Sequence, residues 1–197
     1  MRILSIDFDY FIDTDMETRM MCFPDGHDNF APALTQFIWN SRYDFHENIR
    51  NLGVIANYDK MCDFLKSRQA GKILIADSHR EIAQFFGSVK PDEDLEIINI
   101  DFHHDMYITG GSTLDCGNWL RFLADLKPDA DIKWVMREDS DTEALTGEFP
   151  YATTTNIDEV QGEFDLIFIC FSSPWTPPHL KPRFDEMCKC VGHLEQF

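Results

Sequence analysis

The sequence predicts an α/β domain, built as a three-layer α/β/α sandwich around a mostly parallel sheet. Five short apolar runs, rich in Ile, Val and Phe, are typical of the buried central strands of a parallel sheet. Helical patterns lie between these runs, and strands that alternate with helices place helices on both faces of the sheet. The chain has 197 residues, of which 44% are hydrophobic, and this suits one domain spanning residues 1–197 with a sizeable core.

The elements are expected in alternating order along the chain. The strands should cover residues 2–8, 72–76, 95–100, 132–136 and 164–171. The first helix is predicted by an apolar face made of Val54, Ile55, Tyr58, Met61, Cys62 and Leu65. Further helices are expected at 80–89, 118–127 and 183–194, and Pro128 ends the second of these because proline cannot continue a helix.

Two stretches fit neither pattern. Residues 13–51 are rich in Met, Phe, Asp, Asn and Pro, and their aromatic content argues against disorder. We expect this segment to form an irregular, cap-like loop near the functional site. Residues 138–155 are rich in turn formers and are expected to connect the fourth and fifth strands.

Composition limits the classes of partner. The formal net charge of -18 disfavours nucleic acid, which attracts basic surfaces, and favours cations, although it also fits a surface selected only for solubility. No stretch approaches the ~20 apolar residues of a membrane span, and Asp7 and Asp9 interrupt the first apolar run, unlike a signal peptide. The six cysteines form no Cys-x-x-Cys pair, so a reducing cytoplasm without disulfides is expected. A zinc site at Cys188, Cys190 and His193 would have unusual spacing and no fourth ligand.

Side chains of the kind that bind metals follow three of the expected strands. They are Asp7 and Asp9 after the first, Asp77 and His79 after the second, and Asp101, His103, His104 and Asp105 after the third. In open α/β sheets, ligands bind outside the carboxyl ends of the strands. Converging carboxylates cannot all stay ionised unless a cation neutralises them. The pattern therefore predicts a metal site at this edge, and its many carboxylates point to two ions.

The spacing supports a shared site. Side chains at positions i and i+2 of an extended segment point the same way, which pairs Asp7 with Asp9 and Asp101 with His103. Asp105 continues the second series. Mixed carboxylate and imidazole ligands suit first-row ions such as manganese, iron or zinc.

Several of these residues, each taken alone, would also fit an ordinary structural role. Asp7 and Asp9 would fit turn residues at the end of a strand. His79 would fit a helix cap or a partly buried histidine. His104 is not an expected ligand, because its direction alternates away from that of His103.

The motifs resemble those of a known family. The segment DFHHD at 101–105 resembles the Asp-x-His-x-Asp signature of the arginase/deacetylase superfamily, and His79 resembles the metal-binding His that precedes it. The segment IDFDYF at 6–11 resembles the Asp-x-Asp strand end of the peptide-arginase-like branch, which acts on arginine within peptides. DCGNWL at 115–120 is similar to the Ser-Gly-Asn loop of ureohydrolases, and FICFSSPWTP at 168–177 to a late strand and its Ser-Pro loop.

The chain departs from the family pattern in three ways. The Asp-x-Asp strand comes before the Asp-x-His-x-Asp strand, which a circular permutation would explain, since termini are often close together. The usual His soon after Asn118 is absent, and Trp119 follows instead. The acidic residue that grips the guanidinium is not found in the late loop, where Ser173 and Trp175 stand.

The resemblance implies an arginase-like fold and two divalent ions, Mn²⁺ by analogy. One ion would be bound by His79, Asp101, Asp105 and Asp7, and the other by His103, Asp101, Asp7 and Asp9. Asp105 would also act as the catalytic base or proton relay, with Asn118 and Trp175 as substrate-binding residues. The implied reaction hydrolyses a guanidinium C–N bond to urea and ornithine. An arginine-containing peptide is favoured over a small guanidino substrate, because an acidic surface repels a free α-carboxylate.

Other functions stay open. A haloacid-dehalogenase-like phosphatase would use Asp7 as nucleophile and Asp9 as general acid with one Mg²⁺. Phe11 stands where that family normally has Thr or Val, and the DFHHD segment would have no role. A non-catalytic module could keep the metal cluster without turnover, and the same superfamily also performs amide deacetylation.

Overall fold

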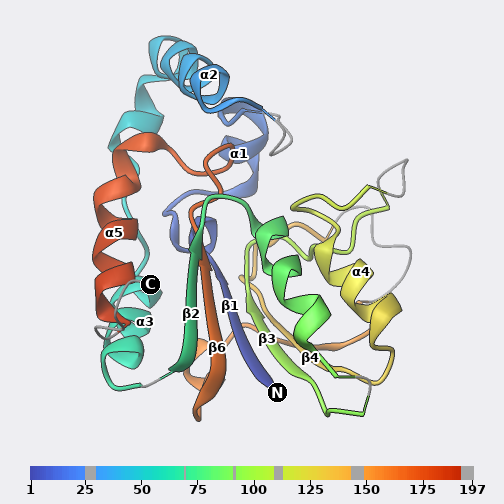
Figure 1. Ribbon diagram of the computed structural model, residues 1–197. Helices are drawn as coiled ribbons and strands as arrows, with labels where there is room; N and C mark the ends of the chain where they lie inside the picture. The colour runs from blue at the N-terminus through green and yellow to red at the C-terminus, as the bar shows by residue number, and fades with distance from the viewer. Residues whose placement is uncertain (25–29, 69, 91, 109–112, 143–148, 192–197) are drawn as a thin grey trace.

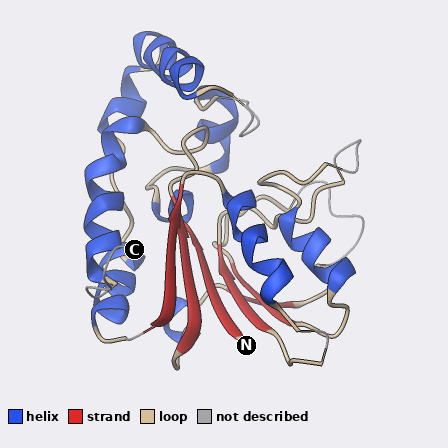
Figure 2. Ribbon diagram, in the orientation of Figure 1, coloured by secondary structure: helices blue, strands red, loops and turns tan. Residues whose placement is uncertain are grey.

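The centre of the protein is a parallel sheet with helices on both faces. The computed structural model describes residues 1–24, 30–68, 70–90, 92–108, 113–142 and 149–191. The sheet has six strands in the order β2-β6-β1-β3-β4-β5, and every neighbouring pair is parallel (Figures 1 and 2). The predicted α/β class and parallel sheet are therefore confirmed, and the helices on both faces are consistent with the three expected layers.

All five expected strands are present, together with one that was not predicted. The strands are β1 (Arg2–Asp7), β2 (Ala70–Ala76), β3 (Glu96–Ile100), β4 (Asp131–Val135), β5 (Ala152–Thr154) and β6 (Phe164–Cys170). β5 lies inside the turn-rich segment 138–155, which was expected to connect the fourth and fifth strands. It has three residues and pairs with β4 at the edge of the sheet, so it carries no apolar run that the sequence could reveal.

The helices alternate with the strands as expected, with some differences in type. The α-helices are α1 (Met16–Cys22), α2 (Pro32–Phe45), α3 (Asn57–Lys66), α4 (Trp119–Leu126) and α5 (Lys181–Cys190). The 3₁₀ helices are η1 (Phe8–Phe11), η2 (Glu47–Asn51), η3 (His79–Ser88), η4 (Ile157–Glu159) and η5 (Pro178–Leu180). The last helix was expected at 183–194, and residues 192–194 of that range lie outside the described residues.

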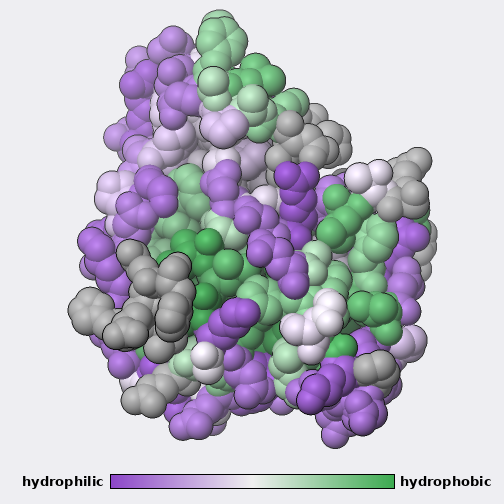
Figure 3. Space-filling model, in the orientation of Figure 1, coloured by the Kyte–Doolittle hydropathy of each residue, from purple (hydrophilic) through white to green (hydrophobic). Residues whose placement is uncertain are grey.

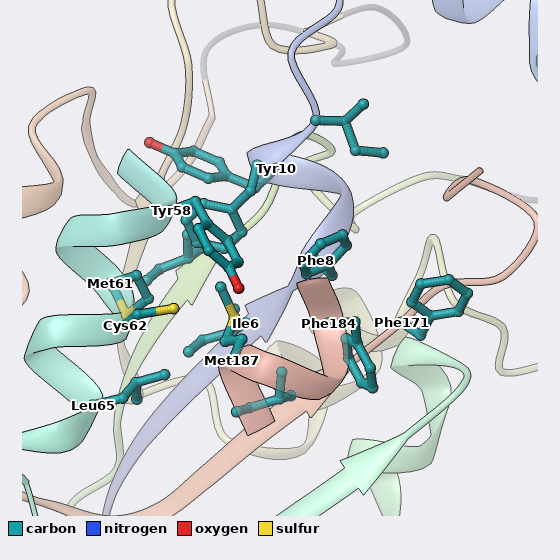
Figure 4. Close-up of a cluster of buried hydrophobic side chains, with 14 of the residues drawn as sticks. Ile6, Phe8, Tyr10, Tyr58, Met61, Cys62, Leu65, Phe171, Phe184 and Met187 are labelled. Atoms are coloured by element: carbon teal, nitrogen blue, oxygen red, sulfur yellow. The ribbon is translucent and has the colours of Figure 1, made fainter. Parts of the chain in front are cut away.

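Apolar side chains pack on both faces of the sheet. On one face, α3 and α5 cover β1, and Phe8 makes edge-to-face contacts with Tyr58 of α3 and Phe184 of α5 (Figure 4). On the other face, η3 and α4 pack on the sheet through residues that include Ile82 and Leu123. The sheet is thus held from both sides, which keeps the carboxyl ends of its strands in fixed positions.

The described residues of the segment 13–51 lie largely in the helices α1, α2 and η2, where an irregular, cap-like loop was expected. Asp15 caps α1 by accepting a hydrogen bond from the Thr18 N–H at 2.7 Å, and Pro32 occupies the first turn of α2. These two helices lie beyond the carboxyl ends of the strands (Figure 1). α2 turns Phe37 and Phe45 toward solvent, and apolar side chains are visible over this helix in Figure 3.

In the described part of the chain, no helix is long and apolar enough to cross a membrane. All six cysteines lie in that part, and no disulfide joins them.

Candidate metal centre

Neighbouring strands bring acidic residues to one edge of the sheet. Asp7 is the last residue of β1 and pairs in register with Cys170, the last residue of β6. Asp101 directly follows β3, which pairs with β1 on its other side. Parallel strands end at the same edge, so the chain delivers these side chains to one place, as the sequence predicted for the carboxyl ends.

His79 reaches the same edge from η3. Ser78 caps this helix, and the Glu81 carboxylate completes a capping box by accepting from the Ser78 N–H at 3.3 Å. His79 is therefore the first residue of the helix and is 1% exposed. Its Nε2 atom lies 2.6 Å from the Ser5 Oγ of β1, and its Nδ1 atom faces the carboxylates.

The Nδ1 atom of His79 lies between three carboxylates. It is 3.0 Å from Asp105 Oδ2, 3.1 Å from Asp101 Oδ2 and 3.4 Å from Asp7 Oδ2. None of these contacts has the direction of a hydrogen bond. We call His79, Asp101 and Asp105 the first cluster, since their ligand atoms lie within 4.8 Å of one another.

A second cluster shares Asp101 with the first. It consists of Asp9, Asp101 and His103, whose ligand atoms also lie within 4.8 Å of one another. His103 Nδ1 is 3.0 Å from Asp9 Oδ2 and 3.8 Å from Asp101 Oδ1. The backbone N–H of His103 donates a hydrogen bond to the same Asp101 oxygen at 2.8 Å. The two oxygens of Asp101 thus face different clusters, which is the arrangement of a bridging carboxylate.

Arg19 of α1 approaches the second cluster. Its Nη1 atom lies 3.5 Å from Asp9 Oδ2, and its Nη2 donates to the Asp9 carbonyl oxygen at 2.6 Å. The guanidinium carbon lies 3.8 Å from the centre of the Phe102 ring. Arg19 is 6% exposed and comes from the segment expected to be a loop, so sequence reasoning missed it. It offsets part of the negative charge of Asp9.

Both clusters contain buried polar atoms without hydrogen-bond partners among the described residues. These atoms include His79 Nδ1, Asp101 Oδ2 and both carboxylate oxygens of Asp9. Buried polar atoms in native proteins are nearly always paired with protein, water or an ion. Carboxylate oxygens and an imidazole nitrogen that converge without bonding one another fit a cation between them. These residues could therefore hold metal ions.

Without a cation, the clusters retain protons. Burial, followed by the charge of neighbouring carboxylates, raises the pKa of Asp7 to about 6. Burial and the charge of Asp101 raise the pKa of Asp105 well above its ordinary value. Burial alone would lower the pKa values of His79 and His103, but the adjacent carboxylates raise both. Burial would raise the pKa of Asp101, yet its contacts with both histidines lower it. An entering cation would displace these protons.

Two residues at the site adopt left-handed backbone conformations. Asp105 has a φ of 52°, and its carboxylate accepts a hydrogen bond from the Trp119 indole N–H. Ser172 has a φ of 51°, and its hydroxyl donates to Asp7 Oδ2 at 2.5 Å. Such conformations are uncommon outside glycine and cluster at functional sites, where the surroundings hold them in place. Here the conformation of Asp105 sets the direction of its own carboxylate, and that of Ser172 places the hydroxyl that holds Asp7.

A cavity of about 500 Å³ opens over the two clusters. Asp7, His103 and Asp105 contribute to its floor, and the apolar side chains of Met16 and Met20 line the wall formed by α1. The volume lies within the range of pockets that bind small ligands, ~300–1,000 Å³. The cap helix therefore borders the space in which a substrate would meet the clusters.

Two further carboxylates line this cavity. Asp115 accepts from the Gly117 N–H at 3.0 Å, and Asp141 accepts from the Tyr107 hydroxyl at 2.5 Å. The Trp175 ring lines the cavity and lies 5.1 Å from the His103 ring, centre to centre. Trp175, which the resemblance implied as a substrate-binding residue, thus lies next to the clusters. The sequence analysis did not single out Asp115 or Asp141.

Some residues singled out in the sequence lie elsewhere. Asn118, predicted to bind substrate, does not line the cavity: its side chain accepts from the Asp115 N–H at 2.8 Å and donates to the Thr113 carbonyl at 3.0 Å, which fixes the loop. His104 is buried outside the clusters, and its Nδ1 accepts from the Met106 N–H. Asp77 accepts from the Ser173 hydroxyl at 2.7 Å, also outside the clusters. The zinc site considered at Cys188, Cys190 and His193 includes a residue, His193, that lies outside the described residues.

The chain was compared with models of protein families, with curated proteins and with solved structures, and none of the three comparisons finds a match. The chemistry of the site therefore rests on its own residues. Those residues form buried clusters of Asp and His that could bind metal, beneath a cavity with acidic and aromatic walls.

Proposed function

We propose that this protein is a metal-dependent hydrolase that cleaves a guanidinium C–N bond of arginine, giving urea and ornithine. The observation that carries the proposal is the pair of buried clusters that share Asp101 at the floor of a cavity. Divalent ions bound in both clusters, with Mn²⁺ as the expected ion, would neutralise the carboxylates and lower the pKa of a water molecule. This is the chemistry needed to attack a planar guanidinium carbon.

The sheet order supports the likeness to a permuted arginase-like domain. Such a domain requires the Asp-x-Asp strand to lie close to the Asp-x-His-x-Asp strand. β1, which ends in Asp7, pairs directly with β3, which precedes Asp101. His79 Nδ1 lies within 3.4 Å of both carboxylates, so one ion could contact all three residues.

Asp105 is the proposed proton acceptor. Its carboxylate lies on the cavity floor, where a water molecule between the clusters and the substrate would be within its reach. The Trp119 indole holds one of its oxygens, and the left-handed backbone sets its direction. An indole N–H does not exchange protons near neutral pH, so Trp119 positions the carboxylate and does not replace the missing shuttle histidine.

The cavity walls suit a guanidinium. If bound ions neutralise the clusters, Asp115 and Asp141 leave negative charge on the wall, and carboxylates accept charge-assisted hydrogen bonds from guanidinium N–H groups. They fill the role of the acidic residue absent from the late loop. Trp175 offers a ring face for stacking, which contributes ~0.5–2 kcal/mol.

An arginine within a peptide fits better than free arginine. Among the described residues that line the cavity, Arg19 is the one fixed cation, and it is already 3.5 Å from Asp9. A free α-carboxylate would therefore find little positive charge to bind. The apolar wall that includes Met16, Met20 and Phe23 suits the neighbouring residues of a peptide.

The phosphatase alternative is less well supported. A general acid must reach the leaving group, but Asp9 is fully buried, contacts Arg19 and does not line the cavity. A non-catalytic binding module would share the same geometry, so activity alone separates it from an enzyme.

The test is urea release from arginine, agmatine and arginine-containing peptides with Mn²⁺ supplied, together with measurement of bound metal. We expect turnover on the peptide and a loss of about 100-fold or more in Asp105→Asn, the usual contribution of proton transfer. Asp129→Asn is the matched control, because Asp129 is 71% exposed and belongs to neither cluster. Bound metal without urea from any substrate would refute the hydrolase and favour the binding module.

A further inference from the structure

We propose that Cys170 is a metal ligand, and that it makes the His79 position favour a borderline-soft divalent ion such as Zn²⁺. This inference rests on the proposed metal-dependent function and concerns which ion one of the two positions takes. Cys170 lies at the end of the apolar strand β6, a setting in which a free cysteine usually behaves as a small buried hydrophobic residue.

The geometry places the thiol among metal-binding groups. Cys170 and Asp7 are register partners at the ends of β6 and β1, and the Cys170 Sγ lies 3.4 Å from Asp7 Oδ2. Ligand atoms of Asp7, His79 and Cys170 all lie within 4.8 Å of one another. The three residues are 4%, 1% and 0% exposed, so water cannot easily replace one of them as a ligand.

A second, independent feature points to a ligand at this place. The Nδ1 atom of His79 is buried, has no hydrogen-bond partner and faces the same space. The Ser5 hydroxyl occupies its other ring nitrogen, which leaves Nδ1 for an ion. The thiol is therefore not an isolated cysteine: it and the Asp7 carboxylate are two ligand groups beside the unsatisfied nitrogen of His79.

The donor set decides the class of ion. Sulfur, imidazole nitrogen and carboxylate oxygen are the ligands of zinc sites, whereas manganese prefers oxygen and nitrogen donors. The second cluster of Asp9, Asp101 and His103 offers no sulfur. The position beside His79 and Cys170 would thus select a softer ion than the second cluster. The site would then hold two different ions when Zn²⁺ and Mn²⁺ are both supplied.

Binding at Cys170 exchanges a proton for the ion. Burial and the charge of Asp7 raise the pKa of this thiol, so the metal-free residue is protonated. Coordination breaks the S–H bond, forms the metal–sulfur bond and releases the proton to solvent, with no change in oxidation state.

Cobalt reports this bond directly, because a thiolate bound to Co²⁺ gives an intense charge-transfer absorption in the near ultraviolet. The wild type, Cys170→Ser and Cys62→Ser are loaded with Co²⁺, and bound cobalt is counted. Cys62 is the control because it is a buried cysteine of α3 outside all three donor groups. We expect the band in the wild type and in Cys62→Ser, and its loss in Cys170→Ser with cobalt still bound.

Affinity gives a second measurement. Cys170→Ser should lower Zn²⁺ affinity by at least about 10- to 100-fold, the loss caused even by removing an outer partner of a ligand, and should change Mn²⁺ affinity much less. Should that variant not fold, X-ray absorption of the zinc-loaded wild type decides, since a sulfur ligand lies at ~2.3 Å from zinc.

The outcomes separate this inference from the proposed function. Bound cobalt without the band, or bound zinc without a sulfur neighbour, would overturn the role of Cys170 and leave the metal-dependent hydrolase intact. A protein that binds neither cobalt, zinc nor manganese would overturn both. A band that persists in Cys170→Ser would assign the thiolate to another cysteine and would also refute the inference.

Discussion

Ser5→Ala is the sharpest test of how the histidine of the first cluster is held. Ser5 is fully buried in β1, and its Oγ lies 2.6 Å from Nε2 of His79. Outer partners of metal-binding histidines fix the ring and its tautomer, and their loss typically costs about 10- to 100-fold in metal affinity. At about 1.4 kcal/mol for each factor of ten, we expect Ser5→Ala to weaken binding of the ion at His79 by about 1.4–2.8 kcal/mol.

The same change should destabilise the metal-free protein. It leaves Nε2 of His79 buried without its partner, and an unsatisfied buried polar group costs about 1–3 kcal/mol. Chemical denaturation without metal measures this loss in the free energy of unfolding, and calorimetric titration with Zn²⁺ or Mn²⁺ measures the metal affinity. The two effects are separable, because the second is measured on protein that remains folded.

Ser88→Ala is the matched control. Ser88 lies on η3 and donates a hydrogen bond to the Phe85 carbonyl at 2.7 Å, but it is exposed and lies at the far end of that helix from His79. It should lower stability modestly and leave metal affinity unchanged. A folded Ser5→Ala protein that binds metal as tightly as the wild type would refute the idea that Ser5 orients His79.

Three further results are expected. Trp119→Phe removes the N–H that holds Asp105, and a hydrogen bond to a charged group is worth ~1.5–3 kcal/mol. The kcat for urea release should therefore fall about tenfold or more, with the amount of bound metal unchanged. An unaltered kcat would contradict the positioning role of Trp119. Metal affinity should fall as the pH is lowered from 7 to 5, because Asp7, with its pKa raised to about 6, and His79, with its pKa also raised, bind protons that the ion must displace. Metal titrations should show up to about a tenfold loss of affinity per pH unit for each proton. An affinity that does not change with pH would exclude this competition. Asp141→Asn should raise KM for a peptide substrate about tenfold through loss of one charge-assisted hydrogen bond, and an unchanged KM would remove Asp141 from guanidinium recognition.

The strands were predictable because burial on both faces leaves a continuous apolar run. β1 and β6 read directly as such runs, and their residues are almost all buried. α2 was not predictable in this way, because Leu34, Phe37 and Phe45 point to solvent, with 44%, 68% and 80% exposure. Apolar residues on the exposed side of a helix hide the periodicity on which such a prediction depends.

The candidate ligands were predictable for a different reason. Asp7 and Asp101 stand at the ends of recognisable strands, and the edge at which parallel strands end is fixed by their direction. Ser5 and Cys170 were missed because each lies inside an apolar run, where a small polar residue gives no signal. Their importance comes from neighbours far along the chain, such as His79 beside Ser5, and only the fold brings these residues together.

The position of β6 has a consequence for how the protein acquires its structure. β6 lies between β1 and β2, and it is the only strand partner of β2 in the described sheet. During synthesis, β2 therefore waits with unpaired backbone groups until residues 164–170 emerge and insert beside it. Contacts so far apart in sequence, such as Asp7 with Cys170 across 163 residues, slow folding and prolong exposure of a sheet edge. The metal centre should be among the last parts to assemble, so that ion uptake marks a fully folded chain.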